Sequence, residues 1–195
     1  MIKMKLILLE FYKNNMCLKS YILIFLIATF STQGQNANSS ASKSIKANFT
    51  IASVKAYQES ATLKVEDFYN YLSLFSAEST SESLKSEIKS SIYNLFEDEN
   101  CYVIDYISIE KNPISLKDLL LKIENKNYLF TVSDFESSIV AKDFWTTQYL
   151  LTLSQNETPT EIVLYQKIGF KPIIKTFGSS KKEVWTLFLS EVSLP

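Results

Sequence analysis

The chain has 195 residues, with 20 basic and 21 acidic side chains, so its formal net charge is −1. Hydrophobic residues make up 46% and charged residues 21%, which excludes a chain that is disordered throughout and a polybasic nucleic-acid binder. Two cysteines are too few for a small fold held together by disulfides.

Histidine and arginine are both missing, since the chain has no His and all 20 basic residues are Lys. His is the commonest general base near neutral pH and a common metal ligand, and Arg binds phosphate as a bidentate fork. A codon bias typical of an AT-rich genome accounts for the pattern. Its consequence is that we assign no catalytic residue, no metal ligand and no cofactor-binding residue, and we expect no cofactor.

The N-terminal residues carry the pattern of a bacterial secretory signal. A ten-residue apolar run, Tyr21–Phe30, follows several lysines and precedes small and polar residues. That order predicts a signal peptide over residues 1–34, cleaved between Gly34 and Gln35. Because the run is about half of the roughly 20 apolar residues that span a bilayer, cleavage is favoured over the alternative, an uncleaved anchor.

Cleavage there would release a mildly acidic protein into the periplasm or the cell exterior. Translation starts at either Met1 or Met16. From Gln35 onward, 16 Lys stand against 20 acidic residues, a net charge of −4, so electrostatics gives no reason to bind nucleic acid. Contact with a membrane is expected only through the export signal. Cys101 is then the single cysteine, and we expect it to be a small buried side chain without a disulfide.

The rest of the chain divides into a linker and a domain. Residues 35–57 are small and polar and are expected to form a flexible linker, and residues 58–195 a single domain. Within the linker, Phe49–Val54 fits either a strand or a helix. In Ala61–Ala77 the apolar residues recur at spacings of three and four, which predicts an amphipathic helix with Thr62 as its N-cap.

A second helix is expected over Glu82–Phe96 on the same periodicity. The segment Cys101–Ile109 consists largely of β-branched and aromatic residues, which predicts a strand. Ser115, with Asp118 three residues later, resembles a capping box and predicts a short helix over Leu116–Glu124.

Strands dominate the remainder of the sequence. Pro172 lacks a backbone N–H, so its surroundings must be an edge or a bend. Turns are expected at residues 155–159 and at Gly178–Ser180. Helices first and antiparallel strands after them predict an α+β domain. Four strands are expected, the first with a break near Asp134–Ser138: Tyr128–Lys142, Phe144–Leu153, Glu161–Phe170 and Glu183–Val192.

This order of helix, helix, strand, short helix and antiparallel strands, over Gln58–Val192, resembles the NTF2-like superfamily. The resemblance implies a strongly curved sheet that wraps around N-terminal helices as a cone, with a pocket between them. It also implies dimerisation through the open face of the sheet. Members include isomerases, dehydratases, ligand binders and interaction modules, and their enzymes generally use a His–Asp pair or a Tyr/Asp set. The absence of His excludes the first of these sets.

Three groups of side chains are candidates for a site. The carboxylates of Asp105, Asp134 and Glu136 lie in expected strands, where burial would raise the pKa and make a base, although strand alternation favours the solvated face. Aromatic residues on the strands, Trp145, Tyr149 and Trp185 among them, would form either a wall for an apolar or sugar-like ligand or ordinary core. Lys181 and Lys182 beside Gly178 are interpreted as charges that protect a sheet edge.

The function that fits best is an exported, soluble, non-enzymatic module that binds a small ligand or a protein partner, with a homodimer as a further option. One alternative is a small NTF2-like enzyme that uses a pocket carboxylate. The other is an envelope-associated module held by an uncleaved anchor.

Overall fold

The computed structural model describes residues 44–98, 100–155 and 158–195. The expected signal peptide and its cleavage site between Gly34 and Gln35 lie outside the described residues, as does the first part of the expected linker. The chain divides into two units, residues 1–41 and residues 42–195, and the described helices and strands belong to the second.

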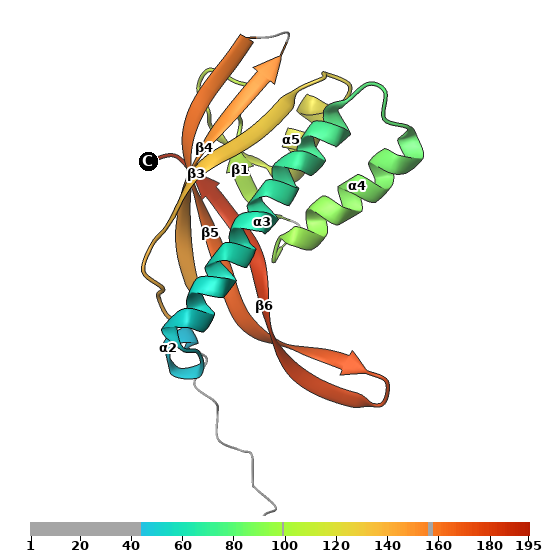
Figure 1. Ribbon diagram of the computed structural model, residues 1–195. Coiled ribbons are helices and arrows are strands. Elements are labelled where there is room, and N and C mark those ends of the chain that lie inside the picture. The colour runs from blue at the N-terminus through green and yellow to red at the C-terminus, as the bar shows by residue number, and fades with distance from the viewer. Residues whose placement is uncertain (1–43, 99, 156–157) are drawn as a thin grey trace, which may run out of the picture. The chain divides into compact units, whose positions relative to one another are not determined.

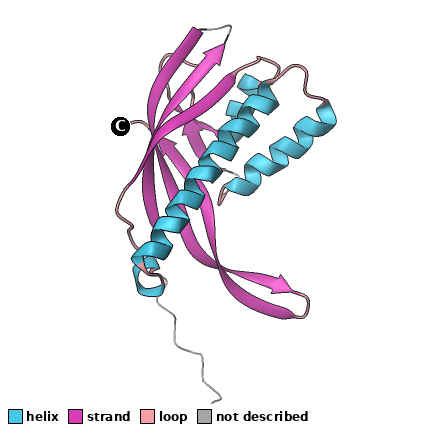
Figure 2. Cartoon of the chain, in the orientation of Figure 1, coloured by secondary structure: helices cyan, strands magenta, loops and turns pink. Residues whose placement is uncertain are grey.

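Helices come first in the chain and strands dominate its second half, which confirms the α+β class (Figures 1 and 2). The elements follow in the order α2 (Ile45–Asn48), α3 (Ile51–Ser76), α4 (Glu82–Leu95), β1 (Tyr102–Ile104), β2 (Pro113–Ser115), α5 (Leu116–Ile123), β3 (Leu129–Ser137), β4 (Phe144–Gln155), β5 (Thr158–Phe177) and β6 (Ser180–Ser193).

The main sheet is antiparallel, with strand order β3-β4-β5-β6, and β1 and β2 form a separate antiparallel pair. Each strand of the main sheet pairs with its neighbour in sequence, so short connections suffice. The register between β3 and β4 shifts between Ser133 and Glu136, where Asp134 has a φ of 56°. This irregularity confirms the break expected near Asp134–Ser138.

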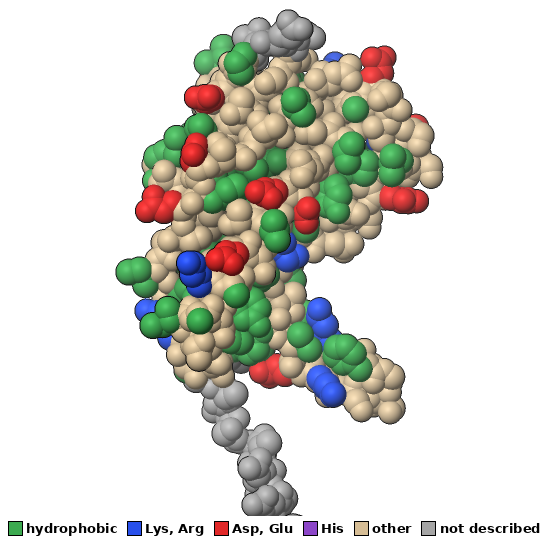
Figure 3. All heavy atoms as spheres, viewed as in Figure 1, with side chains coloured by type: hydrophobic (Ala, Val, Ile, Leu, Met, Phe, Trp, Pro, Cys, Tyr) green, Lys and Arg blue, Asp and Glu red, His purple; other side chains and the backbone are tan. Residues whose placement is uncertain are grey.

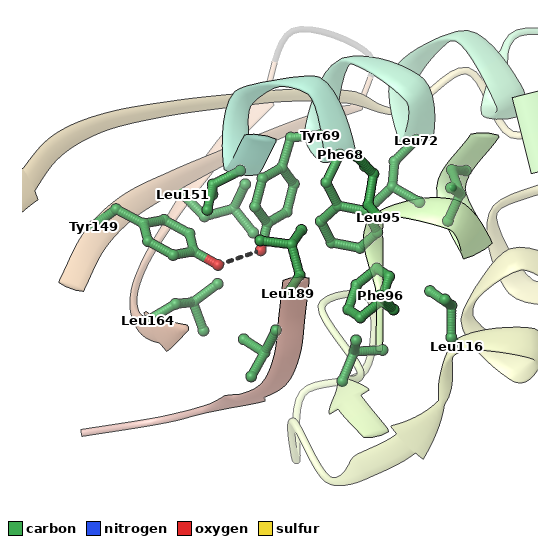
Figure 4. Packing of buried hydrophobic residues seen from close by; sticks show 14 of the residues in the cluster. Phe68, Tyr69, Leu72, Leu95, Phe96, Leu116, Tyr149, Leu151, Leu164 and Leu189 are labelled. Carbon is green, nitrogen blue, oxygen red and sulfur yellow. Dashed lines mark hydrogen bonds between the residues drawn. The ribbon is translucent and has the colours of Figure 1, made fainter. Parts of the chain in front are cut away.

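Helix α3 lies across one face of the main sheet, with α4 beside it (Figure 1). Its apolar side chains at the predicted spacing, including Val65, Phe68 and Leu72, are fully buried. They meet buried side chains from the sheet and from the segment after α4, such as Leu189 and Phe96 (Figure 4). The core therefore sits between α3 and the sheet.

The expected linker is shorter than the sequence predicted, because part of residues 35–57 belongs to the domain. Helix α3 begins at Ile51, and the Thr50 side chain accepts a hydrogen bond from the Ser53 amide at 3.2 Å. The predicted N-cap, Thr62, is wrong: it lies inside the helix and donates to the Gln58 carbonyl at 3.3 Å. Because this stretch has a low average hydrophobicity, the sequence did not indicate that Ile45 is buried, whereas the structure shows it fully buried.

Two expected strands differ from those observed. The strand predicted over Cys101–Ile109 stops at Ile104, because the Asp105 carboxylate accepts hydrogen bonds from amides two and three residues further on and turns the chain. Strand β5 continues through Pro172 as far as Phe177. Its pairing with β4 ends at Gly169, so Pro172 has only β6 beside it, which confirms the expected edge position.

Candidate functional site

Three buried tyrosines join the helical layer, the β1–β2 loop and the main sheet. The Tyr69 hydroxyl, on α3, donates to the Tyr106 hydroxyl in the loop, with an O–O distance of 3.0 Å. It also lies 2.9 Å from the Tyr149 hydroxyl on β4, a contact drawn in Figure 4. None of the three side chains is more than 2% exposed.

The protons of this cluster can be assigned by counting. A tyrosine hydroxyl has one proton, and Tyr69 gives its proton to Tyr106, so Tyr149 must donate to Tyr69. Within the part of the chain that the structure describes, no acceptor receives the Tyr106 proton. Burial is the largest cause that raises the pKa of all three hydroxyls above the usual tyrosine value, so they stay neutral at physiological pH.

The loop that carries Tyr106 is organised by Asp105. The Asp105 amide donates to the Asn112 carbonyl at 2.9 Å, which closes the loop at its base. The Asp105 carboxylate accepts from the amides of Ile107 and Ser108, each at 3.2 Å, and from the Ser108 hydroxyl. It also forms an ion pair with Lys122 of α5. Asp105 thus holds the loop in two ways: its backbone amide joins the two ends, and its carboxylate fixes the first turn and ties it to α5.

The surroundings of Asp105 make it a poor base. Burial raises the pKa of its carboxyl, but the hydrogen bonds from Lys122, the Ser108 hydroxyl and the two amides outweigh burial. The net result is a pKa below the ordinary aspartate value. This carboxylate is therefore ionised at neutral pH and is occupied by donors, so its role is to position the loop.

A pocket of about 440 Å³ opens beside this loop. One wall is the loop, with Tyr106 at its start, and the other comes from the ends of β3, β4 and β5. The end of α3 holds that second wall, because the Ser76 hydroxyl donates to the Tyr128 carbonyl at 2.7 Å. The lining combines aromatic, aliphatic and polar residues: Tyr106, Ile107, Ser108, Ile109, Lys111, Tyr128, Leu153, Gln155 and Thr160.

The other candidate carboxylates do not join this pocket. Asp134 and Glu136 are exposed on β3, as strand alternation predicted. Asp105 is the exception to that expectation: it is 3% exposed, because it belongs to a loop that folds back on itself and not to a strand face. The structure therefore does not bring the three carboxylates together.

The candidate aromatic wall is mostly core. Trp145 and Tyr149 are each 1% exposed, because α3 covers the face of the sheet on which they lie. Trp185 is half-buried and contacts Phe49 and Phe170 at ring-centroid distances of 5.0 and 5.1 Å. Lys181 and Lys182 are exposed at the end of the β5–β6 hairpin.

Cys101 is half-buried, and its thiol donates to the Ser190 carbonyl at 3.3 Å. Burial, with smaller contributions from Asp98 and Glu191, raises the pKa of the thiol to about 12. The thiolate that would act as nucleophile or metal ligand is therefore scarce at neutral pH.

Among the described residues, no group of His, Cys, Asp or Glu side chains could hold a metal ion. No helix of that part of the chain combines the length and the apolar character that a membrane span requires.

Sequence reasoning missed Tyr69, Tyr106 and Lys122. Tyr69 follows Phe68 on the apolar face of the predicted helix, and this position was the available signal that its hydroxyl would need a buried partner. No local pattern pairs Lys122 with Asp105, because the two residues are 17 positions apart and meet only when α5 packs beside the loop.

A search against protein-family models finds no match for this chain, and a search of curated proteins finds no relative.

Proposed function

We propose that this chain is an exported, soluble, non-enzymatic binding module that takes a small organic ligand in the pocket beside Tyr106. We further propose that its helices and sheet have the NTF2-like cone arrangement, with this pocket at the mouth of the cone. The observation that carries the proposal is the pocket itself, about 440 Å³ in volume and built on a loop that the ion pair between the buried Asp105 and the partly exposed Lys122 holds in place.

The lining indicates the chemistry of the ligand. Tyr106, Tyr128 and Leu153 offer aromatic and aliphatic surface, while Ser108 and Gln155 offer hydrogen-bonding groups. Among the described residues of the lining, Lys111 is the one with a charged side chain. A ligand with an apolar ring and a carboxylate or hydroxyl group complements this combination.

The enzyme alternative requires a buried carboxylate with a raised pKa. Asp105 is buried, but its pKa is lowered, and Asp134 and Glu136 are exposed. These residues give that alternative no support. The alternative of a module held by an uncleaved anchor depends on residues 1–34, which lie outside the described residues, and it remains compatible with a ligand in this pocket.

Benzoate and 4-hydroxybenzoate are suitable probes, because each joins an aromatic ring to a carboxylate. We expect either probe, at about ten times its dissociation constant, to raise the free energy of unfolding by about 1.4 kcal/mol. For a domain of this size the melting temperature should rise by about 3 to 5 °C. Thermal unfolding followed by tryptophan fluorescence measures the shift.

Two matched variants locate the effect. Thr160→Trp places a large side chain at the pocket rim, whereas Thr131→Trp places the same side chain at an exposed position on β3, outside the lining. The shift should vanish in the first variant and persist in the second. Equal shifts in both variants, or no shift in the wild type, would reject this pocket as the binding site. Native mass spectrometry of the exported protein then identifies any ligand that it retains.

A further inference from the structure

The last part of the β5–β6 hairpin extends beyond the layer of helices (Figure 1). From Lys171 to Trp185 the two strands pair only with each other, because the pairing of β5 with β4 ends at Gly169. Two large apolar side chains remain uncovered there: Ile174 is 72% exposed and Phe177 is 53% exposed. Both side chains therefore leave more than half of their surface open to solvent.

The same projection concentrates lysines. Lys175 lies directly opposite Lys182 in the antiparallel register, and Lys181 lies opposite Thr176. Like charges at directly opposed positions destabilise a strand pair. Lys171, at the base of the projection, forms an ion pair with Glu97. Further out, the acidic residue that lies next to the exposed lysines along the chain is Glu183, directly after Lys182. An anionic surface would relieve this repulsion.

The first helices of the domain lie at the same end of the molecule. Phe49, between α2 and α3, contacts Trp185 at the base of the hairpin with ring centroids 5.0 Å apart. The Ile45 amide donates to the Lys142 carbonyl at 2.8 Å, which attaches the loop before β4 to α2. This end also exposes isolated apolar side chains: Ile51 is 90% and Ile139 is 86% exposed.

Charge is segregated between this end and the rest of the domain. We define the basic end as residues 44–59, 138–143 and 171–185. It contains seven lysines and three acidic residues, a net charge of +4. The other described residues contain eight lysines and fifteen acidic residues, a net charge of −7. In Figure 3 most of the visible acidic side chains lie in the upper half of the view, while most of the visible lysines lie in the lower half, on the hairpin and on the side opposite to it.

We propose that the basic end docks on the surface of a lipid bilayer that contains anionic headgroups. Phe177 and Ile174 enter the interfacial region, and Lys175, Lys181 and Lys182 lie against the lipid phosphates. Apolar side chains and lysines on one projecting surface supply the two contributions that bind proteins to such interfaces.

The position of the rest of the chain supports a bilayer over other anionic partners. The described chain starts at Ser44, at the basic end, and only residues 31–43 separate it from the apolar run Tyr21–Phe30. Thirteen residues reach at most about 45 Å when fully extended. In a chain that keeps this apolar run in a bilayer, the tether would hold Ser44, at the basic end, within about 45 Å of that bilayer. This inference extends membrane contact from the export signal to the folded domain, and it is independent of the pocket beside Tyr106.

Vesicle binding of charge-reversed variants tests the proposal. The protein is purified in the form that its cells export and is sedimented with vesicles of phosphatidylcholine alone or mixed with phosphatidylglycerol. The hairpin variant is Lys175→Glu, Lys181→Glu and Lys182→Glu. The control variant, Lys89→Glu, Lys117→Glu and Lys126→Glu, makes the same change in net charge at exposed positions outside the basic end.

We expect the wild type to prefer the mixed vesicles and to release them as salt is raised. The hairpin variant should lose about a hundredfold in affinity for them, because each lysine at an anionic surface contributes about fivefold. The control should lose far less. Any binding through residues 1–34 is common to all three proteins and cancels in the comparison. Equal losses in the two variants, or no preference for phosphatidylglycerol, would overturn the proposal.

A second variant reports on insertion directly. Phe177→Trp places an indole at the tip of the hairpin, and vesicles with brominated acyl chains should quench its fluorescence. Quenching no greater than that of the wild type, whose Trp145 and Trp185 provide the baseline, would overturn insertion of the tip. A salt-sensitive dimer that forms without vesicles and is lost in the hairpin variant would instead assign the basic end to a second copy of the chain.

Discussion

Strands β5 and β6 pass through two environments, and the contrast shows what decides burial in this protein. Beneath α3, Leu164 on β5 and Leu189 on β6 are fully buried. Further along the same pair of strands, Ile174 and Phe177 are largely exposed. Both stretches have aliphatic and aromatic residues typical of strands. The difference is the helix that covers one stretch and not the other.

The uncovered stretch also shows what the domain does not need for its stability. Its strand pairing is complete out to Phe177 and Ser180, yet its apolar side chains contribute little buried area. Substitutions there should barely change the free energy of unfolding, whereas equivalent substitutions beneath α3 should change it greatly.

The largest effect is expected for Leu164→Ala, which removes a fully buried side chain from β5 and leaves a cavity. We expect the free energy of unfolding to fall by about 3 kcal/mol. On the same strand, Ile174→Ala should change it by less than about 0.5 kcal/mol. Urea unfolding followed by circular dichroism measures both. Similar losses for the two variants would mean that the hairpin is covered in solution.

Tyr69→Phe should have the next largest effect on the free energy of unfolding. It removes the hydroxyl that accepts from Tyr149 and donates to Tyr106, and so leaves a buried donor without a partner. We expect a loss of about 2 kcal/mol in the free energy of unfolding. Tyr106→Phe should cost about half as much, because Tyr69 still accepts from Tyr149. The assigned donor order would be wrong if Tyr106→Phe were the more damaging variant.

The raised pKa of these tyrosines also predicts alkaline instability. Their neutral form is the one that the folded state stabilises, so the contribution is complete below the unfolded tyrosine pKa of about 10. It is lost as pH rises further, since the unfolded chain ionises first. We expect stability to fall above about pH 10 in wild type, and less steeply in Tyr69→Phe. A parallel decline in the two proteins would contradict this assignment.

Lys122→Met should have a smaller effect, about 1 kcal/mol, because Lys122 is partly exposed and Asp105 keeps its donors from Ile107 and Ser108. The effect should depend on pH. The lowered pKa of Asp105 means that its stabilisation is present above the unfolded value of about 3.9 and is lost as pH falls through the lower, folded value.

The difference in unfolding free energy between wild type and Lys122→Met should accordingly shrink as pH falls below about 4. Lys117→Met, on the same helix but without an ion pair among the described residues, is the matched control. A difference that stays constant from neutral pH into strong acid would show that Lys122 stabilises the loop by packing and not by charge.

The smallest expected effect has the opposite sign. Lys182→Glu replaces the like-charge pair with Lys175 by a cross-strand pair of opposite charge, and should raise the free energy of unfolding by about 0.3 kcal/mol. The same change should weaken binding to anionic vesicles. A variant that is more stable but binds less well would show that the lysine pair is kept at a cost in stability. Equal losses of stability and binding would remove that interpretation.

Much of the local structure was predictable, because its causes lie within a few residues. Ser115 caps α5 with its hydroxyl 3.1 Å from the Asp118 amide, as the capping pattern predicted. The apolar spacing in Ala61–Ala77 matches the buried face of α3, and Pro172 lies at an edge. Caps, periodicity and the missing proline N–H are all properties of short sequence windows.

The candidate site could not be predicted in the same way. The sequence by itself determined the α+β class, the helical faces, the break in β3 and the absence of histidine and arginine chemistry. Only the tertiary structure decided that Asp105 is buried and paired with Lys122, and that Tyr69, Tyr106 and Tyr149 share two hydrogen bonds. It also decided that the end of the β5–β6 hairpin lies beyond the helices of the described residues. The physical reason is range: hydrogen-bonded turns and amphipathic faces depend on neighbours along the chain, whereas burial and pKa depend on segments that meet only after folding.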